Sequence, residues 1–183
     1  MRILIIGNMR TGSTTLARWL ALELGYKLYS EPHCDIVEVD KPLDSEDNIV
    51  VKEIWHHIEG MVGLNDYIKG FDRVIGLVRE DIRDCSISIV HFKDLDWKDK
   101  HNRYMINEEW IAQNEEEIQR LYSEIKDRND KIQRICSFNV TYEGIYNTKE
   151  DLDRLCSYIG LKELKHSYLL GSEYKLRNNL KLI

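Results

Sequence analysis

Residues 3 to 16 of this 183-residue chain are Ile-Leu-Ile-Ile-Gly-Asn-Met-Arg-Thr-Gly-Ser-Thr-Thr-Leu. Four apolar residues run into Gly7, and a short polar loop then opens into an apolar segment that ends at Leu24. This order predicts a buried strand, a tight turn and the N-terminus of a helix. The backbone N–H groups and the positive dipole end of a helix N-terminus favour a bound anion. The stretch therefore predicts an α/β fold with a phosphate-binding loop after the first strand.

The spacing of the loop residues narrows the kind of phosphate ligand. Gly7, Gly12 and Thr14 match the pattern Gly-x4-Gly-Lys-Ser/Thr, but Ser13 stands where that pattern has lysine, and the cation of the loop is Arg10. A loop without the lysine that contacts the β- and γ-phosphates is a poor loop for an ATPase or a kinase. A simple glycine turn with a helix cap is the alternative, but it gives the arginine and the hydroxyl groups no role. We expect a phosphate-bearing ligand other than ATP.

Apolar runs and periodic segments alternate along the rest of the chain. Strands are expected at 27–30, 48–55, 73–79 and 132–142, and helices at 57–69, 82–92, 107–125 and, after a capping box at 148–151, up to Gly160. Strands that alternate with helices predict a single domain over residues 1–183, a three-layer α/β sandwich with a mainly parallel sheet. Ligands of such sheets bind at the carboxyl ends of the strands.

Composition excludes several functional classes. The formal net charge is −6, with no long Lys/Arg block, which argues against a nucleic-acid or anionic-membrane binder. The four cysteines form no Cys-x-x-Cys pair and no Cys/His metal spacing, so no metal is expected and the thiols are typical of a reduced, cytoplasmic protein. The apolar run before Gly7 is too short for a signal peptide or a membrane span.

The segment Met9-Arg-Thr-Gly-Ser-Thr-Thr15 resembles the 5′-phosphosulfate loop of sulfotransferases that use 3′-phosphoadenosine 5′-phosphosulfate (PAPS). The resemblance is strongest to the Pro-Arg-Thr-Gly-Ser-Thr form of the bacterial trehalose-sulfotransferase-like proteins, with Met9 in place of the proline. It implies that the co-substrate contacts a continuous run of loop residues, namely Arg10, Thr11, Gly12, Ser13, Thr14 and Thr15.

A second motif lies between Arg79 and Ser88. It resembles the 3′-phosphate motif of the same family, in which an arginine and a serine bind the phosphate peculiar to PAPS. Arginine offers a planar fork to a dianion, and a serine hydroxyl adds a directional donor. This chain has Asp84-Cys85 where the branch has Gln-Ala. Ser86 is a competing serine, and a surface ion pair of Arg79 with a neighbouring acid is the alternative role.

The segment Tyr29-Ser-Glu-Pro-His33 follows the first strand–helix unit, where the resemblance places an acidic catalytic base. Glu31 matches that position best. The base must reach the acceptor hydroxyl, and a histidine can also take the proton, so His33 is a rival and His56 and His57 are more distant ones. An ordinary loop acid before a turn is the alternative role for Glu31.

Three weaker segments complete the resemblance. Lys52, in a segment similar to the Gly-x-Lys-hydrophobic-x-Trp strand of the branch, is expected near the transferring group or the acceptor. Residues 140–143 resemble a Thr-Tyr-Glu scaffold segment. Lys175, Arg177 and Asn178 form a basic cluster where sulfotransferases often close a loop on the nucleotide, and Arg177 is expected to contact the co-substrate; a solvated tail is the alternative.

Together, these motifs imply a sulfotransferase that transfers a sulfuryl group from PAPS to a hydroxyl group of a small-molecule or glycan acceptor, without a metal. Two other classes stay open. A small-molecule or nucleotide kinase of the P-loop class would explain the first loop but not the missing lysine. A catalytically silent nucleotide-binding protein would explain the anion sites but would leave Glu31 without a role.

Overall fold

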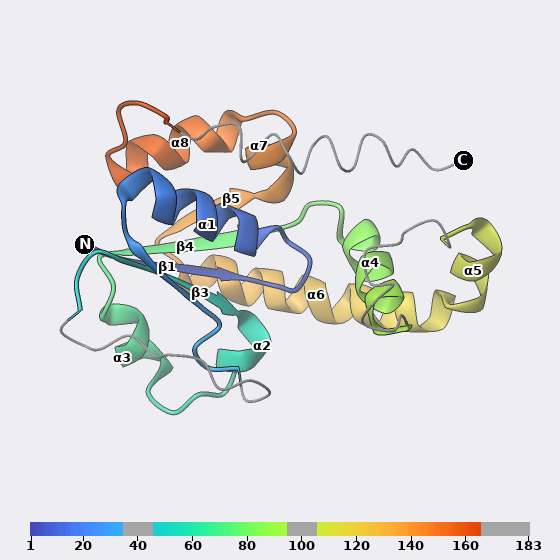
Figure 1. Ribbon diagram of the computed structural model, residues 1–183. Coiled ribbons are helices and arrows are strands. Elements are labelled where there is room, and N and C mark those ends of the chain that lie inside the picture. The colour runs from blue at the N-terminus through green and yellow to red at the C-terminus, as the bar shows by residue number, and fades with distance from the viewer. Residues whose placement is uncertain (35–45, 95–105, 166–183) are drawn as a thin grey trace.

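The computed structural model describes residues 1–34, 46–94 and 106–165. A five-stranded sheet in the order β2-β3-β1-β4-β5 forms its middle layer (Figure 1). Every pairing between neighbouring strands is parallel, which confirms the predicted three-layer α/β fold. The strands are β1 (Arg2–Gly7), β2 (Lys27–Ser30), β3 (Ile49–Ile54), β4 (Arg73–Val78) and β5 (Phe138–Thr141).

Helices cover both faces of the sheet (Figure 1). One face carries α1 (Ser13–Leu24), α7 (Tyr142–Tyr146) and α8 (Glu150–Ile159). The other face carries α2 (Trp55–Ile58), α3 (Leu64–Lys69) and part of α6 (Glu115–Ile135). Beyond the sheet, α4 (Ile82–Asp94) and α5 (Glu108–Gln113) pack with the remainder of α6 around a separate apolar cluster.

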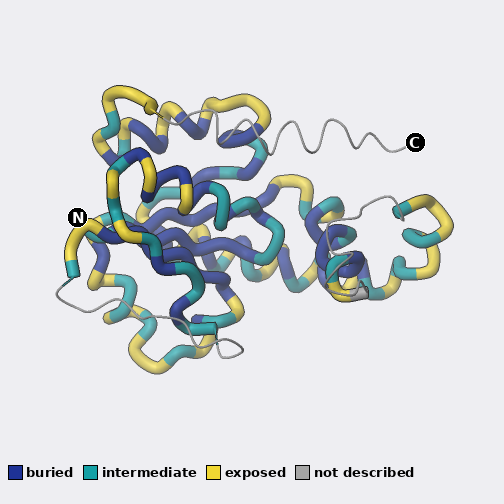
Figure 2. The backbone as a smooth tube through the Cα atoms, in the orientation of Figure 1, coloured by how far each residue is buried: buried dark blue, intermediate teal, exposed yellow. Residues whose placement is uncertain are grey.

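The central strand β1 is buried on both faces, as its near-continuous apolar sequence predicts for a parallel strand. Ile3 and Ile5 point into the core beneath α1, whereas Leu4 and Ile6 point into the core beneath α6. All four side chains are fully buried, and Figure 2 shows the sheet as the most buried part of the backbone. Because β1 lies in the middle of the sheet, the loop that follows it emerges at the centre of one edge.

Two predicted boundaries in the second half of the chain were wrong. The strand expected at 132–142 is only β5, because residues 132–135 continue α6: Ile132 extends the apolar stripe of that helix and is fully buried. The helix expected at 107–125 is interrupted at Asn114, which separates α5 from α6 and whose side-chain amide donates to the Trp110 carbonyl oxygen at 2.9 Å. Local capping by asparagine competes with a continuous helix at this point.

The helix expected at 57–69 and the capping box at 148–151 also differ from prediction. Two short helices, α2 and α3, replace the first, because Gly60 and Gly63 between them adopt left-handed conformations. At the start of α8, the N-cap residue makes no capping hydrogen bond through its side chain; Asp151 is ion-paired with Arg154 through one oxygen, and its other oxygen accepts a 2.7 Å hydrogen bond from the Thr141 N–H. Asp151 therefore joins α8 to the end of β5 and does not complete a capping box.

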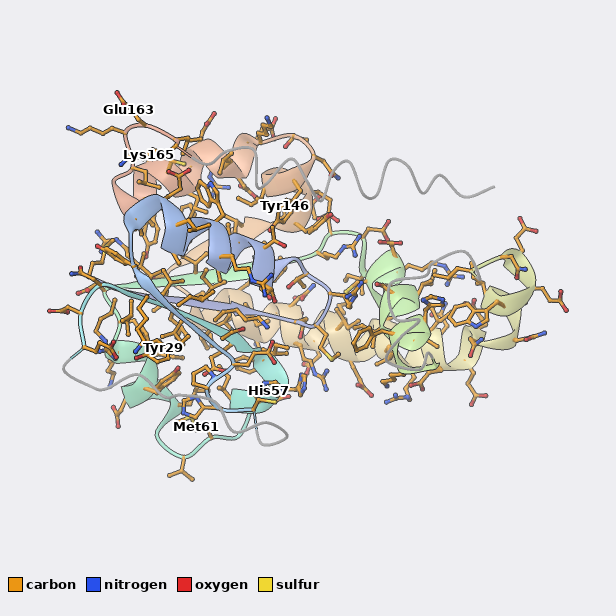
Figure 3. All side chains as sticks on the ribbon, in the orientation of Figure 1. Tyr29, His57, Met61, Tyr146, Glu163 and Lys165 are labelled. Carbon is orange, nitrogen blue, oxygen red and sulfur yellow. The ribbon has the colours of Figure 1, made fainter. Side chains whose placement is uncertain are left out.

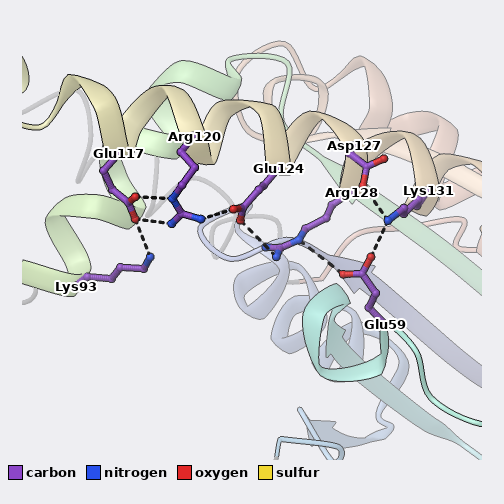
Figure 4. Close-up of polar contacts among 8 residues, drawn as sticks. All are labelled: Glu59, Lys93, Glu117, Arg120, Glu124, Asp127, Arg128 and Lys131. Carbon is purple, nitrogen blue, oxygen red and sulfur yellow. Dashed lines mark hydrogen bonds and ion pairs between the residues drawn. The ribbon is translucent and has the colours of Figure 1, made fainter.

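The outer face of α6 carries a row of ion pairs (Figure 4). They connect successive turns of the helix to one another and, at its two ends, to α4 and to the residue after α2. Solvated pairs of this kind contribute little each to stability, but they keep the face polar. No helix in the described part of the chain has the length and apolar character needed to cross a membrane. The residues of the row are Lys93, Glu117, Arg120, Glu124, Arg128, Glu59, Lys131 and Asp127.

Substitution of Gly144 tests the packing of Asp151. In an exposed helix, Gly→Ala would stabilise by up to about 1 kcal/mol. In α7, however, a Cβ at Gly144 would lie 2.6 Å from the Asp151 Cγ and 2.8 Å from its Cβ. We expect Gly144→Ala to lower the free energy of unfolding by about 1–3 kcal/mol in urea titrations, because overpacking displaces Asp151. Gly70→Ala, with an ordinary φ of −70°, is the control and should change it by less than about 0.5 kcal/mol. Equal stability of the two variants would contradict the prediction.

Candidate functional site

The loop between β1 and α1 is built around Gly12, whose φ of 78° lies in the left-handed region. A Cβ here would lie 2.8 Å from the ring of Tyr146 and 3.0 Å from that of Tyr142. The Tyr146 hydroxyl, which Figure 3 places beside the start of α1, donates a 2.7 Å hydrogen bond to the Gly12 carbonyl oxygen. The Thr11 hydroxyl donates to the carbonyl oxygen of Asn8 at 2.8 Å. The loop is thus held by α7 and by its own side chains, and position 12 requires glycine.

The hydroxyl residues predicted to bind phosphate fall into two groups. Thr11 and Ser13 are buried, and the Thr11 hydroxyl is engaged with loop backbone, so this side chain supports the loop. Thr14 and Thr15 are half-buried in the first turn of α1. The N–H groups of a first helical turn have no intrahelical acceptors, and together with the helix dipole they suit an anion.

Arg10 brings the first loop into contact with the second predicted motif. Its backbone has a left-handed φ of 62°, and its Nε donates a 3.1 Å hydrogen bond to the Ser88 hydroxyl. Its guanidinium carbon also lies 5.4 Å from the ring centroid of Phe92. Arg79 donates from Nη1 to the Arg10 carbonyl oxygen at 3.5 Å. The structure therefore assembles Arg10, Arg79 and Ser88 at one edge of the sheet, with Arg10 as the partner of the serine.

Arg79, directly after β4, is buried among acidic and aromatic groups. It is ion-paired with Asp84, its Nε lies 3.6 Å from the Glu143 carboxylate, and its guanidinium carbon is 4.7 Å from the ring centroid of Tyr142. Burial alone would lower the pKa of Arg79, but the charges of Asp84 and Glu143 outweigh burial and raise it. The guanidinium therefore stays charged, and an incoming anion has to compete with carboxylates for it.

The two carboxylates beside Arg79 differ in how firmly they are held. Glu143 is anchored, because its oxygens accept hydrogen bonds from the backbone N–H groups of Glu80 at 3.0 Å and Asp81 at 3.5 Å. The side chain of Asp84 is 43% exposed. Asp84 is therefore the carboxylate that an anion can replace, whereas Glu143 fixes the turn between β4 and α4. The sequence motif 140–143 indicated scaffold, and this contact gives that scaffold a direct link to Arg79.

The competing serine, Ser86, has a different environment from Ser88. Ser86 is fully buried, and its hydroxyl donates a 2.8 Å hydrogen bond to the Ile82 carbonyl oxygen within α4. Only Ser88 meets an arginine of the first loop. The two serines, two residues apart on one helix, therefore form a natural pair of test and control positions.

A buried amide bridge couples the two loops to α6. Asn8 donates from Nδ2 to the Asn129 Oδ1 at 2.7 Å, and Asn129 donates in turn to the Arg79 carbonyl oxygen at 3.2 Å. Asn129 lies among the apolar positions of α6 and is 6% exposed. Such a bridge fixes the separation between the ends of β1 and β4, where the residues predicted to bind an anion begin.

The predicted base Glu31 lies in a cluster at the ends of β2 and β3. Its carboxylate is ion-paired with Lys52, whose side chain is 2% exposed, and its second oxygen lies 3.7 Å from the His57 Nδ1. Burial lowers the pKa of Lys52, against the opposing effect of the Glu31 contact. Lys52 shares a sheet face with Ile5, beneath α1. Glu31 is thus bound to a desolvated ammonium group.

A second carboxylate, that of Glu53, is hydrogen-bonded to His33, the other predicted base. Glu53 is fully buried, and its Oε1 accepts hydrogen bonds from the His33 Nδ1 at 2.6 Å and the Tyr67 hydroxyl at 3.1 Å. Burial raises the pKa of Glu53, although the bond from His33 opposes this. A carboxylate at Nδ1 fixes the imidazole orientation and sets which ring nitrogen carries the proton. No sequence pattern pointed to Glu53, because this residue lies inside the apolar strand β3.

The remaining predicted residues are less informative. His56 stacks edge-on against His57, and burial followed by the charge of His57 lowers the pKa of His56 to about 4. His56 is therefore a weak proton acceptor near neutral pH. Arg177, with Lys175 and Asn178, lies outside the described residues.

Comparisons with known proteins identify no family for this chain. No family model matches it, and no curated protein matches it. Among solved structures, it is similar to the YorR protein of Bacillus subtilis, described in complex with phosphorylated GDP, at 16% sequence identity and a TM-score of 0.47. The similarity covers 88% of this chain and 97% of that one. A likeness at this level does not identify a ligand.

Removal of the amide bridge should destabilise the protein. Asn129→Ala leaves the Asn8 amide and the Arg79 carbonyl oxygen buried without this partner, which should cost roughly 2–4 kcal/mol in the free energy of unfolding by urea titration. Asp130→Ala, at the exposed neighbouring position, is the control and should stay within about 0.5 kcal/mol of the wild type. If the two variants are equally stable, the bridge contributes nothing.

Proposed function

We propose that this protein is a sulfotransferase that uses PAPS as co-substrate. The observation that carries the proposal is the meeting of Arg10, Arg79 and Ser88 beside the first turn of α1. Two phosphate groups on one nucleotide match two adjacent cationic positions, one in each loop. The proposal also draws on the resemblance of both loop sequences to the 5′- and 3′-phosphate motifs of that family.

The 5′ end of the co-substrate would occupy the first loop. Sulfuryl transfer breaks the bond between sulfur and the bridging oxygen of the 5′-phosphosulfate, and negative charge develops on that oxygen. Arg10 and the N–H groups at the start of α1 are the donors that would stabilise this charge. The acceptor oxygen forms the new bond to sulfur, and its proton passes to a base.

The 3′-phosphate would meet Arg79 and Ser88. The anchored Glu143 would stay in place, and the phosphate would displace the more exposed Asp84 from the Arg79 guanidinium. Charge-assisted hydrogen bonds to a dianion are stronger than those to a single carboxylate oxygen, which favours the exchange. Arg10 is already bonded to Ser88, so the two phosphate positions would share this contact.

The contacts favour His33 over Glu31 as the base. One oxygen of the Glu31 carboxylate is already ion-paired with the buried Lys52 ammonium group. His33 instead has the buried Glu53 carboxylate at its Nδ1, so its Nε2 is the ring nitrogen that this hydrogen bond leaves for a proton transfer. In this assignment Lys52 and Glu31 hold the end of β3, and His33 takes the proton.

One observation favours a second candidate, a nucleotide kinase of the P-loop class. Arg79 is already paired with Asp84 and Glu143. A kinase would keep both ion pairs when it binds its nucleotide, because its nucleotide needs no contact with a 3′-phosphate. Preference for the 3′-phosphate therefore separates the two functions.

Nucleotide affinity tests the 3′-phosphate site. In calorimetry, adenosine 3′,5′-bisphosphate should bind about 10- to 150-fold more tightly than AMP, as expected for a charge-assisted contact of about 1.5–3 kcal/mol. Ser88→Ala should remove most of this preference, whereas Ser86→Ala, whose hydroxyl bonds within α4, should retain it. Tighter binding of ATP than of the bisphosphate would support the kinase instead.

Paired substitutions test the base. In single-turnover transfer of labelled sulfate from PAPS to a panel of sugar, steroid and phenol acceptors, His33→Ala should slow transfer about 10²- to 10⁴-fold. Glu31→Gln should have a smaller effect, and affinity for the bisphosphate should be unchanged in both variants. The reverse order of effects would assign the base to Glu31. Absence of transfer to every acceptor by the wild type would count against the sulfotransferase.

A further inference from the structure

Glu31, Cys34 and His57 form a cluster whose chemistry the proposed reaction does not use. One ligand atom from each residue, a carboxylate oxygen, a thiol sulfur and an imidazole nitrogen, lies within 4.8 Å of the other two. All three residues are half-buried, which leaves them reachable from solvent but partly shielded from it. The other cysteines, Cys85, Cys136 and Cys156, are buried.

A tight turn brings the first two residues together. The Cys34 N–H donates a 2.9 Å hydrogen bond to the Glu31 carbonyl oxygen, and Glu31 itself adopts a left-handed φ of 57°. Pro32, the second residue of this turn, has the backbone angle that such a position prefers. The turn therefore places positions i and i+3 side by side, which is the arrangement that a pair of metal ligands in one loop requires.

The third residue comes from a different element. His57 projects from α2, immediately after β3, and its Nδ1 lies 3.7 Å from the second Glu31 oxygen (Figure 3). Neighbouring ligands of a tetrahedral zinc ion, with bonds of about 2.0–2.3 Å, are roughly 3.3–3.8 Å apart. His56 stacks against the His57 ring and restricts its rotation. Glu31 and His57 thus already have the spacing of two zinc ligands.

The two carboxylate oxygens of Glu31 face different partners. Lys52 contacts Oε1 of Glu31, whereas Oε2 is the oxygen that faces His57. The carboxylate oxygen that a metal ion would use is therefore not the one that Lys52 occupies.

We propose that Glu31, Cys34 and His57 form a binding site for Zn²⁺. Thiolate and imidazole are donors that zinc prefers, whereas Mg²⁺ and Ca²⁺ prefer oxygen ligands only. Three protein ligands leave a fourth position for water or another ligand, and Lys52 holds the carboxylate in orientation from its other oxygen. Cysteine spacing in the sequence does not indicate this site, because only one ligand is a cysteine. Glu31 and Cys34 lie in one turn, and His57 comes from a different element. The site does not depend on sulfotransferase activity.

Cobalt binding tests the proposal, because Co²⁺ occupies zinc sites and reports a thiolate ligand by a charge-transfer absorption band. The full-length protein, reduced and free of metal, should develop this band together with the visible bands of a four-coordinate ion, and Zn²⁺ should abolish both. Even partners outside the ligand shell typically change metal affinity about 10- to 100-fold. Cys34→Ser and His57→Ala should therefore weaken Co²⁺ and Zn²⁺ binding by at least tenfold.

A matched control makes the result decisive. Cys156→Ser keeps the three ligands and should retain the absorption bands, and circular dichroism should show that every variant is folded. A wild-type protein that gives no thiolate band, or that binds Co²⁺ as well after Cys34→Ser, would overturn the site. So would Mg²⁺ competing as well as Zn²⁺. These readouts need no PAPS, so failure of the sulfotransferase proposal would leave them unaffected.

Discussion

The burial of β1 on both faces is the constraint on which the rest of the structure depends. A central parallel strand must be apolar on both sides, and its neighbours must run in the same direction. The carboxyl ends of the strands consequently lie at one edge. Gly7, Ile54 and Leu77 are neighbours there by register, and the chain changes to polar residues just beyond them. Loops that are distant in sequence lie close together because each follows the carboxyl end of a strand, and these ends are neighbours in the sheet.

The order of strands and helices could be predicted from the sequence because buried elements show characteristic patterns of apolar residues. The strand segments were recognisable from their apolar runs, and Gly160 marked the end of α8 as predicted. Boundaries failed where local and tertiary preferences compete. Residues 132–135 are Ile-Gln-Arg-Ile, whose isoleucines have the spacing of one helix face, and Ile132 belongs to the buried stripe of α6. Asn114 interrupts a helix whose apolar spacing continues across it.

The candidate site was only partly predictable from the sequence. Arg10, Arg79 and Ser88 could be named because each belongs to a local motif, and the structure brings them together. Their partners could not be named. Glu143, Asn129 and Glu53 act through contacts with residues far away in the chain, and each lies in a segment whose pattern indicates only scaffold or core. Such pairings depend on which side chains face one another across elements, and one-dimensional spacing does not record this.

The described cations at this edge share one property: each already has a partner inside the protein. Arg79 is paired with Asp84 and Glu143, Lys52 is paired with Glu31, and Arg10 is bonded to Ser88. Buried cations without acidic partners would be costly in a chain of net charge −6 that must also fold without a ligand. If an anion binds Arg79 as proposed, it would have to replace one of these partners. Asp84 would be the partner replaced, because its side chain is more exposed than that of Glu143.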